Sequence, residues 1–211
     1  MTVRRPAVAG SFYPDDPEEL KGLIRDSYMH PLGPGSAPPA KVQREGVMAC
    51  VCPHAGYIYS GPVAAHSYLW ASSLRHPELV VVVGPNHYGI GSGISTFREG
   101  EWATPLGNVQ IDSDSARKIV ELTGIVDFDP ESQRREHSLE VQVPFLQAIY
   151  GTFKLLPICL AFQDIETARE LGRGLSVLLK GRDAILVASS DLTHYEPASV
   201  ARRRIRLSSR R

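Results

Sequence analysis

The chain has 211 residues, of which 43% are hydrophobic and 22% charged, a composition typical of a globular protein with one substantial core. Its 23 basic and 23 acidic residues cancel, so no overall field attracts it to nucleic acid or to an anionic membrane. It contains neither the run of roughly 20 apolar residues that crosses a bilayer nor the apolar core of a signal peptide. We therefore expect a cytoplasmic protein that binds neither nucleic acid nor membranes.

The first element in chain order is a turn followed by a helix. The turn, GSFYP over residues 10–14, carries the adjacent aromatic side chains of Phe12 and Tyr13. Either Asp15 or Asp16 is suited to cap a helix over residues 17–29 that has proline at its first position.

Three apolar runs then share one arrangement, in which a β-branched stretch leads into a turn with histidine. The runs lie within residues 47–53, 78–89 and 184–195. Uninterrupted apolar runs of this length are typical of strands buried on both faces of a parallel sheet.

The segments between these runs complete an α/β pattern. We expect helices over residues 61–74, 113–122, 136–146 and 165–179, a further strand over residues 153–160, an antiparallel excursion over residues 89–111 and a turn over residues 127–131. Either Asp112 or Ser113 is suited to cap the second of these helices. Alternating strands and helices predict a mostly parallel central sheet flanked by helices.

Polar side chains follow the three apolar runs where each strand ends. His54 follows the first run, His87 the second, and Asp191 and His194 the third. Groups beyond the carboxyl ends of parallel strands line the ligand crevice of open α/β sheets. Two histidines and a carboxylate there can bind a divalent transition metal, although each histidine could instead serve only as a hydrogen-bonding group at a strand end.

Further polar residues admit more than one role. Asp191 and His194 could supply a metal ligand, orient an imidazole or act as general acid and base. Glu136, His137 and Ser138 fall at the start of an expected helix, where its dipole favours an anion, but Glu136 or Ser138 could simply cap that helix. Serine hydrolase and phosphate-loop motifs are absent from the sequence.

Five motifs in order resemble one known family over residues 3 to about 200. They are RRPAVAGSFYP, PHAGYIYSG, GPNHYG, EHSLEVQVPFLQ and SSDLTHY. The chain is similar to Memo-like proteins, also called AmmeMemoRadiSam system protein B, which share the fold of class III extradiol dioxygenases.

The resemblance implies roles for individual residues. His54 and His87 match the two metal-binding histidines, and Asp191 and His194 match the pair in the cleft, His194 standing where the dioxygenases keep their acid/base histidine. We expect iron (Fe2+), with copper as the alternative. Three further residues are expected to support these ligands: Glu136, His137 and Tyr59.

The end of the chain departs from the family pattern. Memo-like proteins continue past SSD-x-x-H to a cysteine ligand, and no residue here matches it, so the third ligand cannot be identified. We expect one incomplete domain over residues 1–200 and an arginine-rich tail over residues 201–211, which is either a non-native reading or a true short form. Core surface left uncovered would favour homo-oligomers.

Two main functional hypotheses follow. In the first, the protein is a non-haem metal oxidoreductase, dioxygenase-like, with a small molecule in its cleft. In the second, it is a non-enzymatic peptide-binding or adaptor protein with a vestigial metal site and aromatic walls, namely Phe12, Tyr13, Tyr57 and Tyr59. Metal-assisted hydrolysis is a third alternative.

Overall fold

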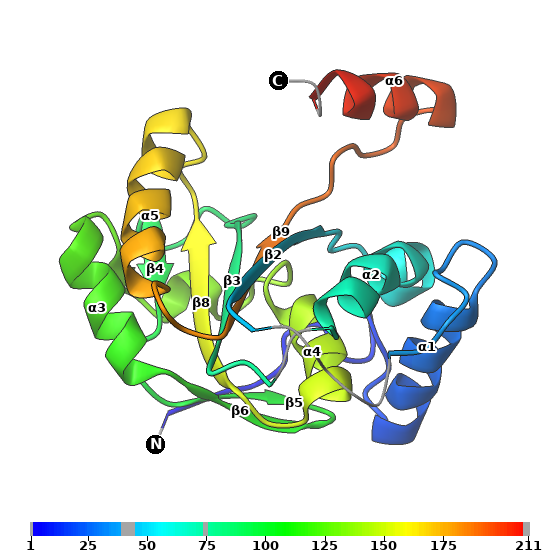
Figure 1. Cartoon of the computed structure of the whole chain (residues 1–211), viewed down its shortest axis with the longest axis horizontal. Coiled ribbons are helices and arrows are strands. Elements are labelled where there is room, and N and C mark those ends of the chain that lie inside the picture. Colours follow the sequence, from blue (N-terminus) through cyan, green and yellow to red (C-terminus); the bar gives the residue numbers. More distant parts are fainter. Residues whose placement is uncertain (1, 39–44, 74–75, 209–211) are drawn as a thin grey trace.

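The computed structural model describes residues 2–38, 45–73 and 76–208, and these form a sheet covered by helices on both faces (Figure 1). Its strands are β1 Val3–Arg4, β2 Val47–Cys52, β3 Leu79–Pro85, β4 Ile94–Thr96, β5 Glu101–Thr104, β6 Gly107–Ile111, β7 Asp127–Phe128, β8 Lys154–Leu160 and β9 Ala184–Ser189. Its α-helices are α1 Pro17–Met29, α2 Tyr57–Ala71, α3 Ser113–Thr123, α4 Val143–Tyr150, α5 Ile165–Leu178 and α6 Ala198–Ser208, and two 3-10 helices are η1 Glu131–Gln133 and η2 Glu140–Gln142. None of the helices described is long and apolar enough to cross a membrane.

The sheet is mostly parallel, as the sequence predicts. Its strand order is β1-β5-β6-β8-β3-β9-β2, with β4 paired to β8 and β7. Antiparallel pairing joins β5 to β6 and β4 to β8, in the predicted excursion, and the remaining pairs are parallel. The three strands that precede the predicted site residues, β3, β9 and β2, are neighbours, so their carboxyl ends lie at one edge of the sheet.

Successive side chains of a strand point to opposite faces of the sheet and pack into two separate hydrophobic cores. Val80 and Val82 of β3 join the core beneath α1, α2 and α4, whereas Leu79 and Val81 join the core beneath α3 and α5. This alternation is the period-two geometry of a strand covered on both faces. Figure 1 shows the two helical layers on opposite sides of the sheet, and α6 standing away from both at the end of an extended segment.

Two predicted helix caps are confirmed. The Asp16 side chain accepts hydrogen bonds from the backbone N–H groups of Glu18 and Glu19 at the start of α1, and Asp112 accepts one from Ser115 in α3. Both are the usual arrangement in which a short acidic side chain satisfies the free donors of a first turn.

The predicted start of the second helix is wrong. We expected it to open at Gly61 and Pro62, but α2 begins at Tyr57 and contains Pro62. Proline removes the hydrogen bond to the carbonyl one turn earlier, that of Ile58, and Ile58 is 71% exposed, so water can solvate this carbonyl. The helix ends at Ala71, and the expected end at Leu74 lies outside the described residues.

The predicted helix over residues 136–146 is also wrong at its start. Glu136 to Leu139 form a loop, η2 begins at Glu140 and α4 at Val143. The loop is held by distant groups, because the Glu136 carbonyl accepts a hydrogen bond from Arg4 Nη2 at 2.8 Å and its carboxylate binds His87. The expected helix-dipole effect on Glu136 therefore does not apply.

Two smaller differences concern short segments. Asp127 and Phe128, expected in a turn, form β7 because they pair with Ser95 and Thr96 of β4. The arginine-rich tail is helical in part, since α6 reaches Ser208, and residues 209–211 lie outside the described part of the chain.

Candidate metal centre

The carboxyl ends of β2, β3 and β9 each present a polar residue two positions beyond the strand. These residues are His54 after Cys52, His87 after Pro85 and Asp191 after Ser189. The ring centroids of His54 and His87 are 5.1 Å apart, with the rings nearly perpendicular. Strand adjacency thus brings together two imidazoles that are separated by 33 positions in the sequence.

A third imidazole, that of His137, completes a cluster. Its ring centroid lies 4.5 Å from that of His87 and 5.6 Å from that of His54. One nitrogen from each of the three rings lies within 4.8 Å of the others, close enough to hold one metal ion. From the sequence we expected only a supporting role for His137, beside Glu136 and Tyr59.

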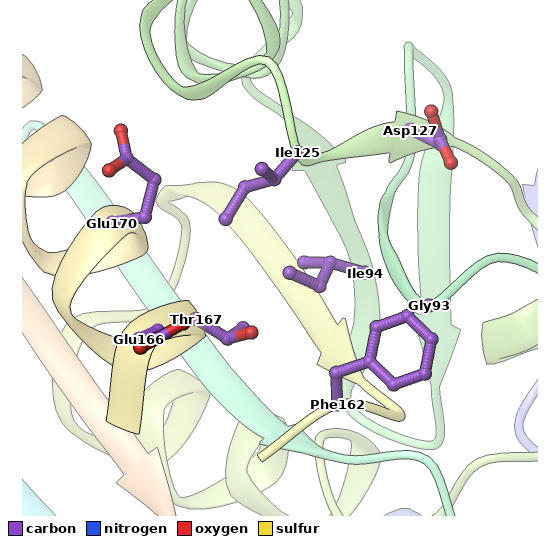
Figure 2. A pocket seen from close by; sticks show the side chains of 8 residues that line it. All are labelled: Gly93, Ile94, Ile125, Asp127, Phe162, Glu166, Thr167 and Glu170. Atoms are coloured by element: carbon purple, nitrogen blue, oxygen red, sulfur yellow. The ribbon is translucent and has the colours of Figure 1, made fainter. Parts of the chain in front are cut away.

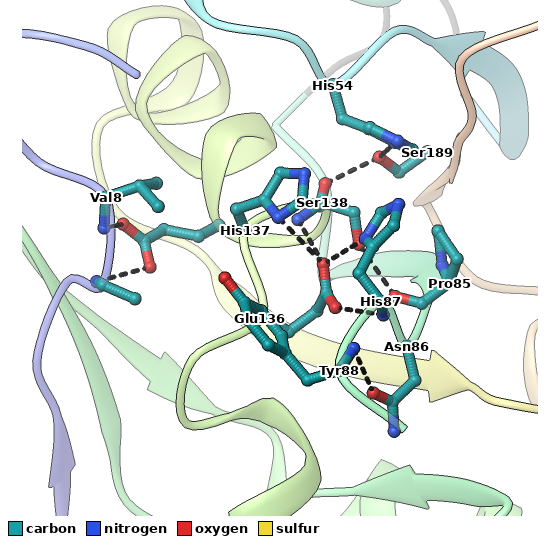
Figure 3. A network of polar contacts seen from close by, with 12 residues as sticks. Val8, His54, Pro85, Asn86, His87, Tyr88, Glu136, His137, Ser138 and Ser189 are labelled. Atoms are coloured by element: carbon teal, nitrogen blue, oxygen red, sulfur yellow. Dashed lines mark hydrogen bonds and ion pairs between the residues drawn. The ribbon is translucent and has the colours of Figure 1, made fainter. Parts of the chain in front are cut away.

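Glu136 determines which nitrogen of His87 is free. Its buried carboxylate accepts hydrogen bonds from the His87 backbone N–H at 2.7 Å and from His87 Nδ1 at 2.9 Å (Figure 3). Burial raises the pKa of Glu136, but hydrogen bonds from His87 and Ser138 outweigh burial and lower this pKa overall. A charged carboxylate accepts the Nδ1 proton, so the lone pair of His87 is on Nε2.

Ser189 has the same effect on His54. The Ser189 hydroxyl donates its single proton to the Ser138 carbonyl at 2.6 Å and lies 2.8 Å from the donor Nε2 of Gln142. It must therefore accept the Nδ1 proton of His54, 3.0 Å away, which leaves the lone pair of His54 on Nε2. From the sequence we predicted no role for Ser189 or Gln142, because no motif or spacing in the sequence links either residue to His54.

The surroundings of His54 and His137 favour the neutral forms of these two imidazoles. The pKa of His54 is lowered to about 4, mainly by burial of the ring. The charge of Asp191 raises this pKa in part, whereas the neighbouring His87 and His137 lower it further. Burial likewise lowers the pKa of His137. A neutral imidazole has the free lone pair that a metal ion needs.

Asp191 and His194 form a second group that shares His54. Asp191 Oδ1 accepts a hydrogen bond from the His54 backbone N–H at 2.7 Å, and Oδ2 lies 3.0 Å from His194 Nε2 and 3.8 Å from His54 Nε2. These three side chains also bring one ligand atom each within 4.8 Å of the others. The His194 side chain is 58% exposed, so it faces solvent at the rim of the site.

The aromatic residues proposed as cleft walls have different surroundings. The Phe12 ring lies 4.8 Å from that of His137, whereas Tyr13 and Tyr57 are buried in the core. Tyr59 is 78% exposed, and no hydrogen bond or ring contact joins it to the imidazoles within the described residues. Phe12 is therefore the aromatic side chain that borders the cluster directly.

Buried Glu140 holds the segment that carries Phe12. Its carboxylate accepts hydrogen bonds from Arg4 Nη1 and the Tyr13 hydroxyl, both at 2.6 Å, and from the backbone N–H groups of Ala7 and Val8. One carboxylate thus orders the irregular N-terminal stretch beside the site, which explains how a segment without secondary structure can form a wall.

The donor set fits a transition metal. Imidazole and carboxylate ligands suit iron, copper, nickel and zinc, and hydrogen bonds to the non-ligating nitrogens are typical of metal sites. His54, His87 and His137 could hold such an ion, as could His54, Asp191 and His194.

The fold and this site define an α/β protein whose parallel strands end in a histidine cluster able to hold a metal. Residues 4–206 match the family described as Memo-like protein. The chain is 46% identical over 206 residues to a MEMO1 family protein of Methanopyrus kandleri, covering 96% of this chain and 73% of that protein. It is 48% identical over 205 residues to a MEMO1 family protein of Aeropyrum pernix, covering 93% and 72% respectively. The chain belongs to the Memo-like family, as its motifs predicted.

Proposed function

We propose that this chain binds a non-haem metal ion, iron(II) in the first place and copper as the alternative, through His54, His87 and a third group. The observation that carries the proposal is that the Nδ1 atoms of both imidazoles are hydrogen-bonded to Ser189 and Glu136, while one nitrogen of each ring lies within 4.8 Å of the other. His137 or Asp191 is the third ligand of choice. Glu136 is not, because its carboxylate is already occupied by hydrogen bonds.

The proposed activity is oxidoreductase chemistry on a small molecule in the cleft. An iron or copper ion bound there would supply redox chemistry and a coordination position for substrate. Asp191 accepts the Nε2 proton of His194 and so leaves the Nδ1 lone pair of His194 free to take a proton from a bound substrate. The Phe12 ring, whose centroid lies 4.8 Å from that of His137, would limit the access of water from that side.

Metal analysis of the purified full chain tests the proposal. We expect iron or copper to copurify at close to one ion per chain and to be lost in a His54→Ala, His87→Ala double variant. His66→Ala is the matched control, because His66 lies on the exposed side of α2 and binds the Leu32 carbonyl. Equal metal content in the parent, the double variant and the His66→Ala control would contradict the proposed site. Bound iron without turnover of any catechol would contradict dioxygenase activity but not metal binding.

The second candidate is a non-enzymatic peptide-binding or adaptor function. Exposed apolar side chains at the start of α2, Ile58 at 71% and Tyr59 at 78%, favour it, because they follow directly on the segment that carries His54. Peptide binding that survives a chelator and is lost in an Ile58→Ser, Tyr59→Ser variant would support this function over the first.

A further inference from the structure

A cavity of about 780 Å³ lies beside the histidine cluster, between the N-terminal segment and the loop that contains η1. Its lining residues are Thr2 to Ala7, Tyr88, Phe97, Pro130, Glu131, Arg134 and Arg135. This volume is in the range of small-molecule sites, which are roughly 300–1,000 Å³. Two lining residues adjoin the metal centre in sequence, since Tyr88 follows His87 and Arg135 precedes Glu136.

The cavity has an excess of positive charge. Arg4 is paired with Glu140, and Arg134 with Glu131 at 2.8 Å. Arg5 and Arg135 form no ion pair with any residue that the structure describes, and the Arg135 guanidinium lies 5.2 Å from the centroid of the Tyr88 ring. Two guanidinium groups are therefore available to an anion.

The walls of the cavity are tied together by a buried side chain. The Arg4 guanidinium donates to the carbonyls of Gln133 and Glu136, at 2.9 and 2.8 Å, and to the Glu140 carboxylate at 2.6 Å. These bonds join the N-terminal wall to the loop that carries Arg134 and Arg135. A ligand would meet a preformed site and would lose less free energy to ordering of the protein.

A second cavity of the same protein has the opposite charge, so the positive charge is a property of the first cavity alone among these two. The cavity in Figure 2, of about 490 Å³, lies between α5 and the β4–β7 pair and is also floored by apolar side chains, including Ile94, Ile125 and Phe162. Its charged lining residues are carboxylates, those of Asp127, Glu166 and Glu170. Both cavities have apolar lining residues, but the charges of the lining suit an anion only in the first.

We propose that the cavity lined by Arg5 and Arg135 binds a small molecule with a carboxylate or phosphate group, whose apolar part packs against Tyr88 and Phe97. Guanidinium groups favour these anions because their planar donors match two oxygens at once. The proposal goes beyond the metal function and does not require a metal ion.

Saturation-transfer NMR on the full chain tests this with benzoate and phenyl phosphate as carboxylate and phosphate probes. Benzamide is the uncharged control of the same shape. We expect both anions to bind, benzamide not to bind, and an Arg5→Gln, Arg135→Gln variant to bind roughly tenfold or more weakly. Preference for one anion identifies the group that the site takes.

Further variants separate this proposal from the metal site. Phe162→Ala, in the acidic cavity, should bind both anions as the parent does, and so should the His54→Ala, His87→Ala variant. An Arg5→Lys, Arg135→Lys variant should recover part of the affinity, because it restores charge without the bidentate geometry. Equal binding of benzamide, unchanged affinity after the glutamine substitutions, or loss of binding in the histidine variant would each overturn the proposal.

Discussion

Ser189 Oγ lies 3.0 Å from Nδ1 of His54, and this contact determines which nitrogen of the imidazole can face a metal ion. Ser189 is on β9 and His54 follows β2, the neighbouring strand, with Cys52 paired directly to Ser189. The sheet register therefore sets the chemistry of the side chain. A hydroxyl with its only proton already donated can accept but cannot donate, so the imidazole must be the donor.

Replacing Ser189 with alanine should weaken metal binding. The change removes the hydroxyl that accepts hydrogen bonds from Nδ1 of His54 and Nε2 of Gln142. Loss of a residue that hydrogen-bonds to a metal ligand typically lowers metal affinity by about 10- to 100-fold. A competition titration with a chromophoric chelator measures the affinity. Ser67→Ala, which removes a hydrogen bond to Val51 on the exposed side of α2, is the control and should leave the affinity unchanged.

A Glu136→Gln variant should lose both stability and metal affinity. The carboxylate accepts from His87 and Ser138, and an amide would turn a donor toward at least one of these donors. We expect the free energy of unfolding of the metal-free protein to fall by about 1–3 kcal/mol, measured by urea denaturation. The same change at exposed Glu131, whose one ion pair among the described residues is with Arg134, should cost less than about 0.5 kcal/mol. Equal effects at the two positions would contradict the role of Glu136.

Stability of the metal-free protein should fall in acid because of His54. Its pKa is about 4 in the folded chain against 6.5 in its ordinary state, so the unfolded chain binds more protons between these values. Stability from this group is complete above pH 6.5 and is lost as the pH falls toward 4. The full loss is roughly 3 kcal/mol, at about 1.4 kcal/mol per pKa unit.

Urea denaturation at pH 7 and pH 4.5 measures this dependence. A His54→Gln variant has no imidazole to protonate at this position, so its loss of stability between the two pH values should be smaller than that of the parent. Identical losses in the two proteins would show that His54 is not responsible.

Arg4 should be among the most important single residues for stability. Arg4→Met leaves the buried Glu140 carboxylate without its cation, and breaking a buried ion pair costs about 3–5 kcal/mol. Arg5→Met, one position along on the exposed side, should change the free energy of unfolding by no more than about 0.5 kcal/mol. Thermal and urea unfolding of both variants check this, and equally small effects of the two substitutions would contradict the role of the Arg4–Glu140 pair.

The sequence by itself determined the mostly parallel sheet and the approach of His54 to His87. Long apolar runs of β-branched residues are compatible with few structures other than strands buried on both faces, and the carboxyl ends of such strands share one edge. The caps of α1 and α3 were equally predictable, because capping depends on residues two or three positions apart.

Only the tertiary structure decided the remainder of the site. Glu136 reaches His87 from 49 positions away, and Ser189 reaches His54 from 135, so no local pattern records these contacts. The bonds of Glu136 to Arg4 and His87 also hold the non-helical loop that contains His137, and the imidazole of this residue lies in the cluster. Local propensity sets which elements form, whereas the orientation and protonation of a buried imidazole depend on whichever groups the fold packs against it.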